Sequence, residues 1–165
     1  MLQKIEYDRY SAVRYALDWA KRRNPIYYDF ENIGGDCTNF VSQCLYAGCG
    51  VMNYADQNGW YYIDLNDRAP SWTGVAFLRE FLLTNKGVGV YGIEASLENL
   101  SLGDVIQLRD ESGRFYHSLL ISMIREPVNP ENIDVCAHSF DARNRRLSTY
   151  DHRLSKGIHI IGARR

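Results

Sequence analysis

The chain has 165 residues, of which 45% are apolar and 24% are charged, and its formal net charge is −1. This length suits one domain with a substantial core, so we expect residues 1–165 to form a single domain. The near-neutral charge gives no electrostatic basis for binding nucleic acid or an anionic membrane. The apolar stretches are too short to cross a bilayer, which excludes membrane insertion from the expected functions.

The N-terminal segment has no hydrophobic signal core. If Met1 is the native start, the protein is expected in the cytoplasm, whereas a chain trimmed from a secreted precursor would look the same. The cysteines show neither a CxxC pair nor zinc-finger spacing, so we expect free thiols and no metal or other cofactor. They are Cys37, Cys44, Cys49 and Cys136.

The first half of the chain is predicted to be helical. An apolar stripe indicates a helix from about Asp8 to Arg23, which Asn24-Pro25 ends. A second helix is predicted from Cys37 to the glycine-rich stop at residues 48–50. Residues 51–70 have no period and are expected to form an ordered surface loop next to the site. Ser71 is predicted to cap a third helix that continues through Leu82.

The second half is predicted to form strands. A hairpin is expected from Val105–Leu108 and Phe115–Ile124, followed by strands at Ile133–Ser139 and Ile158–Ala163. Residues 141–146 are expected to be a polar loop. Helices followed by antiparallel strands indicate an α+β domain with an N-terminal helical part and a C-terminal antiparallel sheet.

Cys37 is the most informative residue, because it lies where a glycine turn gives way to the second predicted helix. Free backbone amides and the helix dipole favour negative charge in the first turn. A thiol there is expected to lose its proton more easily, and the thiolate is the nucleophile of cysteine hydrolases. The same amides are candidate oxyanion donors, with Tyr27 or Tyr28 as a second donor.

A cysteine nucleophile requires a base, and the base requires an orienting group. His117 and His138 lie on adjacent predicted strands, so we expect them side by side, within reach of Cys37. In this interpretation His117 takes the thiol proton and His138 holds the His117 ring. Asp141 and Asn144 are alternative orienting residues.

Aromatic residues make up 13% of the chain, and many of them gather at residues 27–30 and 54–72. Core packing explains most of them, while a groove wall for peptide or glycan is the functional alternative. The substrate-binding candidates are Tyr28, Trp60, Trp72 and Asp36. Asp36 precedes the nucleophile and is interpreted as a helix cap rather than a proton carrier.

Taken together, these motifs resemble the putative amidase domain family of bacteria. The resemblance rests on the segment GDCTNFVSQCL at Gly35–Leu45, on Trp60 and Trp72, and on Tyr116-His117-Ser118 and Ala137-His138-Ser139. That family is similar to NlpC-type and CHAP cell-wall hydrolases, which implies a papain-like fold. The resemblance also implies that Cys37 is the nucleophile, His117 the base and His138 the third polar residue.

The predicted function is therefore a cysteine amidase or peptidase that hydrolyses an amide bond through a thioester, with a peptide or peptidoglycan-type substrate. A catalytically idle module that binds peptide or glycan on the same scaffold is the alternative. A third reading is an acyl-transferring enzyme in which an amine replaces water.

Overall fold

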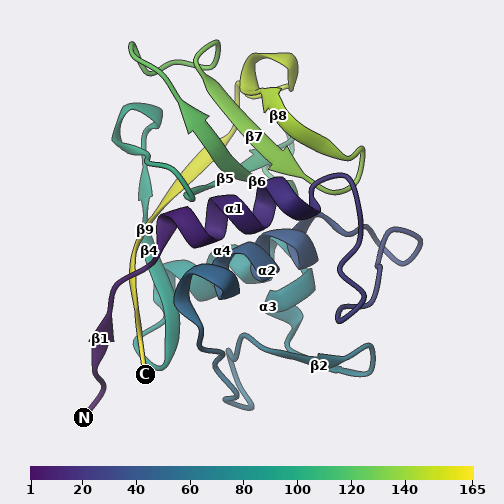
Figure 1. Cartoon of the computed structure of the whole chain (residues 1–165), viewed down its shortest axis with the longest axis vertical. Coiled ribbons are helices and arrows are strands. Elements are labelled where there is room, and N and C mark those ends of the chain that lie inside the picture. Colours follow the sequence, from purple (N-terminus) through teal and green to yellow (C-terminus); the bar gives the residue numbers. More distant parts are fainter.

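A seven-stranded antiparallel sheet carries the helices on one of its faces (Figure 1). The computed structural model describes residues 1–165. The strand order is β1-β9-β5-β6-β7-β8, and β4 pairs with β9. These strands are β1 Lys4–Ile5, β4 Gly89–Ala95, β5 Val105–Arg109, β6 Phe115–Ile124, β7 Ile133–Ala137, β8 Ala142–Arg146 and β9 Lys156–Arg164.

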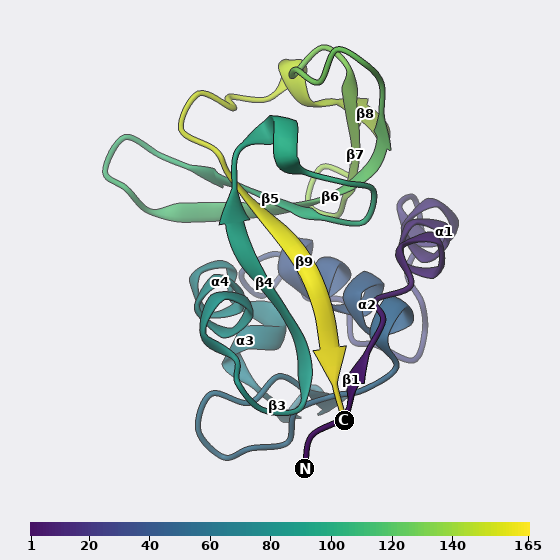
Figure 2. The ribbon, with the colours of Figure 1, turned by 90° about the vertical axis from the view of Figure 1, so that its left-hand side faces the viewer.

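Four helices and a small separate hairpin complete the α+β fold. Figure 2 shows the helices behind the long strands β4 and β9, with the two chain ends close together. Backbone hydrogen bonds between Gln3 and Arg165 join those ends. The helices are α1 Arg9–Trp19, α2 Cys37–Cys49, α3 Pro70–Thr73 and α4 Val75–Thr84, and the hairpin strands are β2 Tyr62–Asp64 and β3 Asp67–Arg68.

Helix α2 is the central helix, and its boundaries are those predicted from the sequence. Almost all of its side chains are buried, because it packs between α1 and the strands β6 and β7. Gly50 ends it in the left-handed conformation with φ 69°, which a residue without Cβ adopts freely. Gly48 is required for close packing, since a Cβ there would lie 2.3 Å from the Tyr7 ring.

Two apolar clusters lie on the two faces of the sheet. The larger joins the helices to the sheet through residues such as Phe40, Leu45 and Leu120. The smaller lies under the 3₁₀ turn Leu147–Thr149 and includes Leu108, Leu119 and Val135. Side chains alternate between faces along a strand, so neighbouring residues of β6 belong to different clusters. This alternation decides which residues of β6 can meet α2.

Several predicted elements differ from the observed ones. Helix α1 ends at Trp19, four residues before the predicted end. The third helix is interrupted at Gly74, and Ser71 donates its hydroxyl to the Gly59 carbonyl at 2.5 Å instead of capping. Residues 142–146 form strand β8 rather than a loop, and β1 and β4 were not anticipated.

The segment 51–70 is also packed differently from the prediction. Trp60 and Trp72 are fully buried, with ring centroids 4.9 Å apart. Their indole nitrogens donate to Ser42 and Asn39 of α2, at 3.0 Å and 2.9 Å. The two tryptophans therefore anchor the central helix from inside the core. They cannot form the wall of an open groove, which corrects the sequence-based expectation.

Candidate active site

A cavity of about 400 Å³ opens at the N-terminal end of α2. Cys37 and His117 both line it, although 79 residues of the chain separate them. Thus the fold brings together the two residues that the sequence singled out as nucleophile and base. The other lining residues are Gly34, Gly35, Leu108, Tyr116, Ser139, Phe140, Arg145, Thr149, Tyr150 and Asp151.

The start of α2 leaves backbone donors free beside Cys37. Asp36 occupies the N-cap position, but its side chain makes no capping hydrogen bond. The first amide of the helix with a backbone acceptor is that of Phe40, which donates to the Asp36 carbonyl at 3.0 Å. The amides of Cys37 and Thr38 therefore remain available to an oxygen that develops negative charge.

Cys37 is buried, with 7% of the residue exposed. Burial raises the pKa of the thiol, while hydrogen bonding from the Ser118 backbone and from Thr38 works in the opposite direction. The expectation of an easily deprotonated thiol is therefore not met in the free protein, because desolvation outweighs the helix start. At neutral pH the thiol keeps its proton.

A buried polar network supports the helix start from the sheet side. Thr38 and Ser118 share a hydrogen bond of 2.9 Å between their hydroxyls, and Gln107 donates to Ser118 at 3.2 Å. This network fixes the first turn of α2 against β5 and β6. Ser118 thus contacts the first turn of α2, whereas the ring of its neighbour His117 lies near Tyr150 in the cavity that Cys37 also lines.

His117 makes no hydrogen bond within the protein. Its ring lies 6.1 Å from that of Tyr150, and its residue pairs with Leu108 across the β5–β6 ladder. Burial and, to a smaller extent, the positive charge of Arg145 together lower the pKa of His117 to about 4. The imidazole is therefore neutral at physiological pH and able to accept a proton.

Arg145 is the cavity residue that sequence reasoning missed. It lies on β8, which was expected to be a loop, and its guanidinium is 3.8 Å from the Tyr150 ring centroid. Its Nε donates to the Thr149 hydroxyl at 2.8 Å, and its Nη2 donates to the Thr149 carbonyl at 3.0 Å. Recognising β8 as a strand would have been needed to place this charge beside His117.

The structure places His138 away from His117 and binds both of its ring nitrogens elsewhere. Nδ1 lies 2.5 Å from an Asp36 carboxylate oxygen, and Nε2 lies 2.9 Å from the Trp19 carbonyl. The ring also stacks on Phe40 at 4.1 Å. Both contacts are made to oxygen atoms, so each ring nitrogen already has a partner. No nitrogen is left to orient His117.

The two alternative orienting residues are also engaged elsewhere. Asp141 accepts two hydrogen bonds from Arg23, at 2.9 Å and 3.1 Å. Asn144 accepts from the Ser122 hydroxyl at 2.7 Å. Neither residue lines the cavity, so the structure shows no side chain that holds the His117 ring by a hydrogen bond.

The remaining predicted substrate contacts do not line the cavity either. Asp36 is fully buried and accepts from the Phe30 amide and the Asn39 side chain, at 2.9 Å and 2.8 Å. The Tyr28 ring lies against Phe30, and its carbonyl accepts from Asn39. Tyr27 packs on Trp72 in the core. These residues shape the loop before the nucleophile rather than the surface that a substrate would touch.

The β7–β8 turn forms one wall of the cavity in an unusual conformation. Ser139 and Phe140 both have positive φ, at 60° and 63°, which costs energy for residues with a Cβ. The Ser139 hydroxyl accepts from the Asp36 amide at 3.0 Å and donates to Glu31 at 3.1 Å. The turn is thereby tied to the loop that carries Cys37, and Phe140 is left 91% exposed at the cavity.

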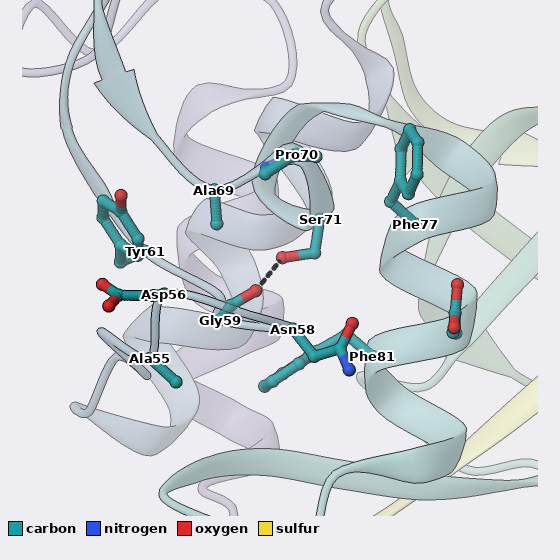
Figure 3. A pocket seen from close by; sticks show the side chains of 11 residues that line it. Ala55, Asp56, Asn58, Gly59, Tyr61, Ala69, Pro70, Ser71, Phe77 and Phe81 are labelled. Atoms are coloured by element: carbon teal, nitrogen blue, oxygen red, sulfur yellow. Dashed lines mark hydrogen bonds between the residues drawn. The ribbon is translucent and has the colours of Figure 1, made fainter.

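A second cavity, of about 230 Å³, lies between the loop at residues 55–61 and helices α3 and α4 (Figure 3). It shares no lining residue with the first. Its one serine, Ser71, already donates to the Gly59 carbonyl, as the dashed line in Figure 3 shows. It contains no cysteine or histidine, so it offers no nucleophile paired with a base.

No group of three or more His, Cys, Asp or Glu side chains is placed to hold a metal ion. All four cysteines are buried and unbonded to one another. None of the helices has the length and apolarity needed to span a bilayer.

One cavity of this α+β domain therefore holds both a cysteine at a helix start and a neutral histidine. Residues 6–161 match the family described as "Putative amidase domain", and the chain belongs to that family. No solved structure matches the chain.

Two proteins of Bacillus subtilis (strain 168) are similar to parts of the chain. "Uncharacterized protein YhbB" is 34% identical over 150 residues, which cover 89% of this chain and 46% of that protein. "Uncharacterized protein YjcM" is 27% identical over 124 residues, which cover 70% of this chain and 28% of that protein. The chain thus spans less than half the length of either relative.

Proposed function

We propose that the protein is a cysteine hydrolase of amide bonds, with Cys37 as nucleophile and His117 as base, in a papain-like arrangement related to NlpC-type and CHAP enzymes. The observation that carries the proposal is the single cavity lined by both residues at the start of α2. Membership of the amidase family supports the amide as the reacting bond. A peptide, including a cell-wall stem peptide, is the substrate class we favour.

The proposed reaction has two steps. The Cys37 sulfur attacks the amide carbonyl carbon while the thiol proton passes to His117, and the oxygen takes the electron pair toward the free amides of Cys37 and Thr38. The C–N bond then breaks, the amine leaves with the proton from His117, and an acyl thioester remains. In the second step water attacks the thioester, releases a carboxylic acid and restores the thiol.

His138 has a supporting place in this proposal. Its bonds to Asp36 and to the Trp19 carbonyl hold the residue that immediately precedes the nucleophile. We therefore assign His138 as a positioning residue and not as the group that orients the base.

A catalytically idle binding module is the second candidate, and one observation favours it. The raised pKa of the Cys37 thiol disfavours the thiolate in the free protein. A hydrolase with this cavity has to transfer the proton after the substrate has bound, whereas a binding module has no need of the transfer.

The test is hydrolysis of N-acylated dipeptide amides and of muropeptides, followed by mass spectrometry of the products. We expect Cys37→Ala to lower the rate at least about 10³-fold, since no nucleophile remains. Cys49→Ala is the matched control, because Cys49 is a buried cysteine at the other end of α2 and should keep the activity. Hydrolysis by Cys37→Ala at the wild-type rate would exclude the proposed mechanism, and tight binding without turnover would favour the binding module.

A further inference from the structure

Arg145 carries a charge that no carboxylate of the protein neutralises. The ion pairs of the structure engage its neighbour Arg146, which bonds Asp134 at 3.2 Å, but not Arg145. The two observed hydrogen bonds of Arg145 go to the hydroxyl and carbonyl of Thr149. A half-buried cation without a counter-ion is costly unless a partner arrives from outside, so this residue points to a ligand.

The guanidinium is already held in one orientation. Its face lies against the Tyr150 ring at 3.8 Å, and Thr149 fixes Nε and Nη2. Nη1 has no acceptor within the protein, and a guanidinium has five N–H donors, so most of its donor capacity remains unused. A planar, pre-oriented fork of this kind matches a carboxylate, which accepts two parallel hydrogen bonds.

The other groups around the cavity are compatible with an anion. Asp151 is the one carboxylate on the cavity wall, and its side chain is already paired with Arg153 at 3.1 Å. His117 is neutral, and the remaining side-chain surface comes largely from aromatic and aliphatic groups such as Tyr116 and Phe140. Arg145 is therefore the unpaired charge of the cavity that holds Cys37.

We propose that Arg145 is the carboxylate receptor of this cavity, so that the preferred substrate is an amide whose acyl or amine part carries a free carboxylate beside the scissile bond. The proposal rests on the proposed function in calling the ligand a substrate. Recognition of the carboxylate itself requires no catalysis and can be measured separately.

The same contact links recognition to chemistry. Arg145 is the charge that adds to burial in keeping the pKa of His117 low. A carboxylate bound to the guanidinium cancels much of that positive field, so the imidazolium becomes easier to form and His117 becomes a stronger base. The residues that share the cavity with His117 include Cys37 from α2, Leu108 from β5, Arg145 from β8, and Tyr150 and Asp151 from the segment that follows β8. Of these, only Arg145 and Asp151 are charged.

Binding is tested with Cys37→Ser protein, which cannot consume the probes as the wild type does. The first pair is acetyl-Ala-Ala and its C-terminal carboxamide, which differ by a carboxylate on the amine side. The second pair is succinyl-Ala-amide and acetyl-Ala-amide, which differ on the acyl side. Titration calorimetry should show at least tenfold tighter binding of the carboxylate in one pair, and that pair identifies the side of the scissile bond.

Three variants separate the role of the charge from a structural role. Arg145→Gln should abolish the preference for the carboxylate, and Arg145→Lys should retain part of it because a lysine keeps the charge without the fork. Arg146→Gln is the matched control on the same strand and should keep the full preference. NMR titration of the His117 ring gives a second readout, since its pKa should rise both in Arg145→Gln and on addition of the carboxylate probe to protein with Arg145 intact.

The outcomes distinguish this proposal from the proposed function. Equal affinity for both members of each pair in protein with Arg145 intact would overturn the carboxylate receptor, whether or not amides are hydrolysed. A carboxylate preference that survives in folded Arg145→Gln protein would assign the recognition to another residue and overturn it as well. Conversely, a preference that depends on Arg145 together with no turnover of any amide would support the receptor and contradict the hydrolase.

Discussion

His117 lies on β6 and His138 directly follows the neighbouring strand β7, yet their surroundings are opposite. His138 is 1% exposed, and each of its ring nitrogens has a partner within 3 Å. His117 is partly exposed at the cavity and has no hydrogen-bond partner at all. A ring with every donor used contributes to stability, whereas an unbonded neutral ring remains free to accept a proton. The two residues are of the same type, so what separates the candidate base from the positioning residue is whether the ring nitrogens have hydrogen-bond partners.

The two regions act on the same helix from different sides. His138 and Arg23 hold Asp36, the residue before Cys37, through contacts to its carboxylate at 2.5 Å and 3.6 Å. His117 and Arg145 face the thiol side through the cavity. Stability and reactivity are therefore assigned to separate residues, and substitutions should affect one property at a time.

The largest expected effect is on stability at His138. His138→Ala removes one hydrogen-bond partner from the buried Asp36 carboxylate and one from the Trp19 carbonyl, which should cost about 3–5 kcal/mol of unfolding free energy. His117→Ala breaks no hydrogen bond, and we expect it to cost about 1 kcal/mol while abolishing hydrolysis. Urea unfolding, followed by tryptophan fluorescence, measures both values.

The double variant Asp36→Asn/His138→Ala is the control for the ion pair. Removing the charge from Asp36 should recover part of the loss, so that the two changes are not additive. Equal destabilisation by His138→Ala and His117→Ala would contradict the assignment of a stabilising role to His138 alone.

The next largest expected effect is the pH dependence of folding stability that His117 causes. Its pKa of about 4 in the folded protein lies below the value of about 6.5 expected for the unfolded chain. The unfolded chain therefore binds a proton in this window when the folded protein does not. The resulting stability is fully present above pH 6.5 and is lost as the pH falls toward 4.

A variant that lacks only the His117 imidazole, His117→Phe, isolates this contribution from that of the other titrating groups. Wild type should lose more unfolding free energy than His117→Phe between pH 7 and pH 5. The limit for one proton is about 1.4 kcal/mol per pH unit, and the partial exposure of the ring reduces it. Parallel stability curves for the two proteins would show that His117 is not held neutral by its surroundings.

The parts of this arrangement that could be predicted from the sequence are those marked by local signals. The glycines on either side of α2 and its apolar spacing fixed both ends of the helix, and the alternating segment Phe115–Ile124 was predicted with its observed bounds. Strand β8 was missed because three arginines in five residues are typical of a solvated loop. The strand is recognised only from its pairing with β7 and from the burial of Leu147, the residue that directly follows it.

The partners of the two histidines required the register of β6 and β7, which no local pattern encodes. Leu120 pairs with Cys136, and continuing this ladder by two residues sets His138 across from Ser118 rather than His117. A shift of one residue along a strand turns a side chain to the other face. His138 therefore meets α2 and Asp36 in the core, while His117 faces the cavity and Arg145.

The smallest expected effect lies in the turn between the two regions. The Phe140 backbone has a strained left-handed conformation, with φ 63°, although the residue is 91% exposed. Burial of its side chain therefore cannot explain the conformation. Phe140→Gly should raise the unfolding free energy by about 0.5–1 kcal/mol, because glycine adopts this conformation without strain. Phe140→Ala keeps the strain and removes the ring, so it should show no gain. Equal stability of Phe140→Gly and Phe140→Ala would contradict the assignment of strain. If the Phe140 ring contacts substrate at the cavity wall, both variants should also raise KM with little change in kcat.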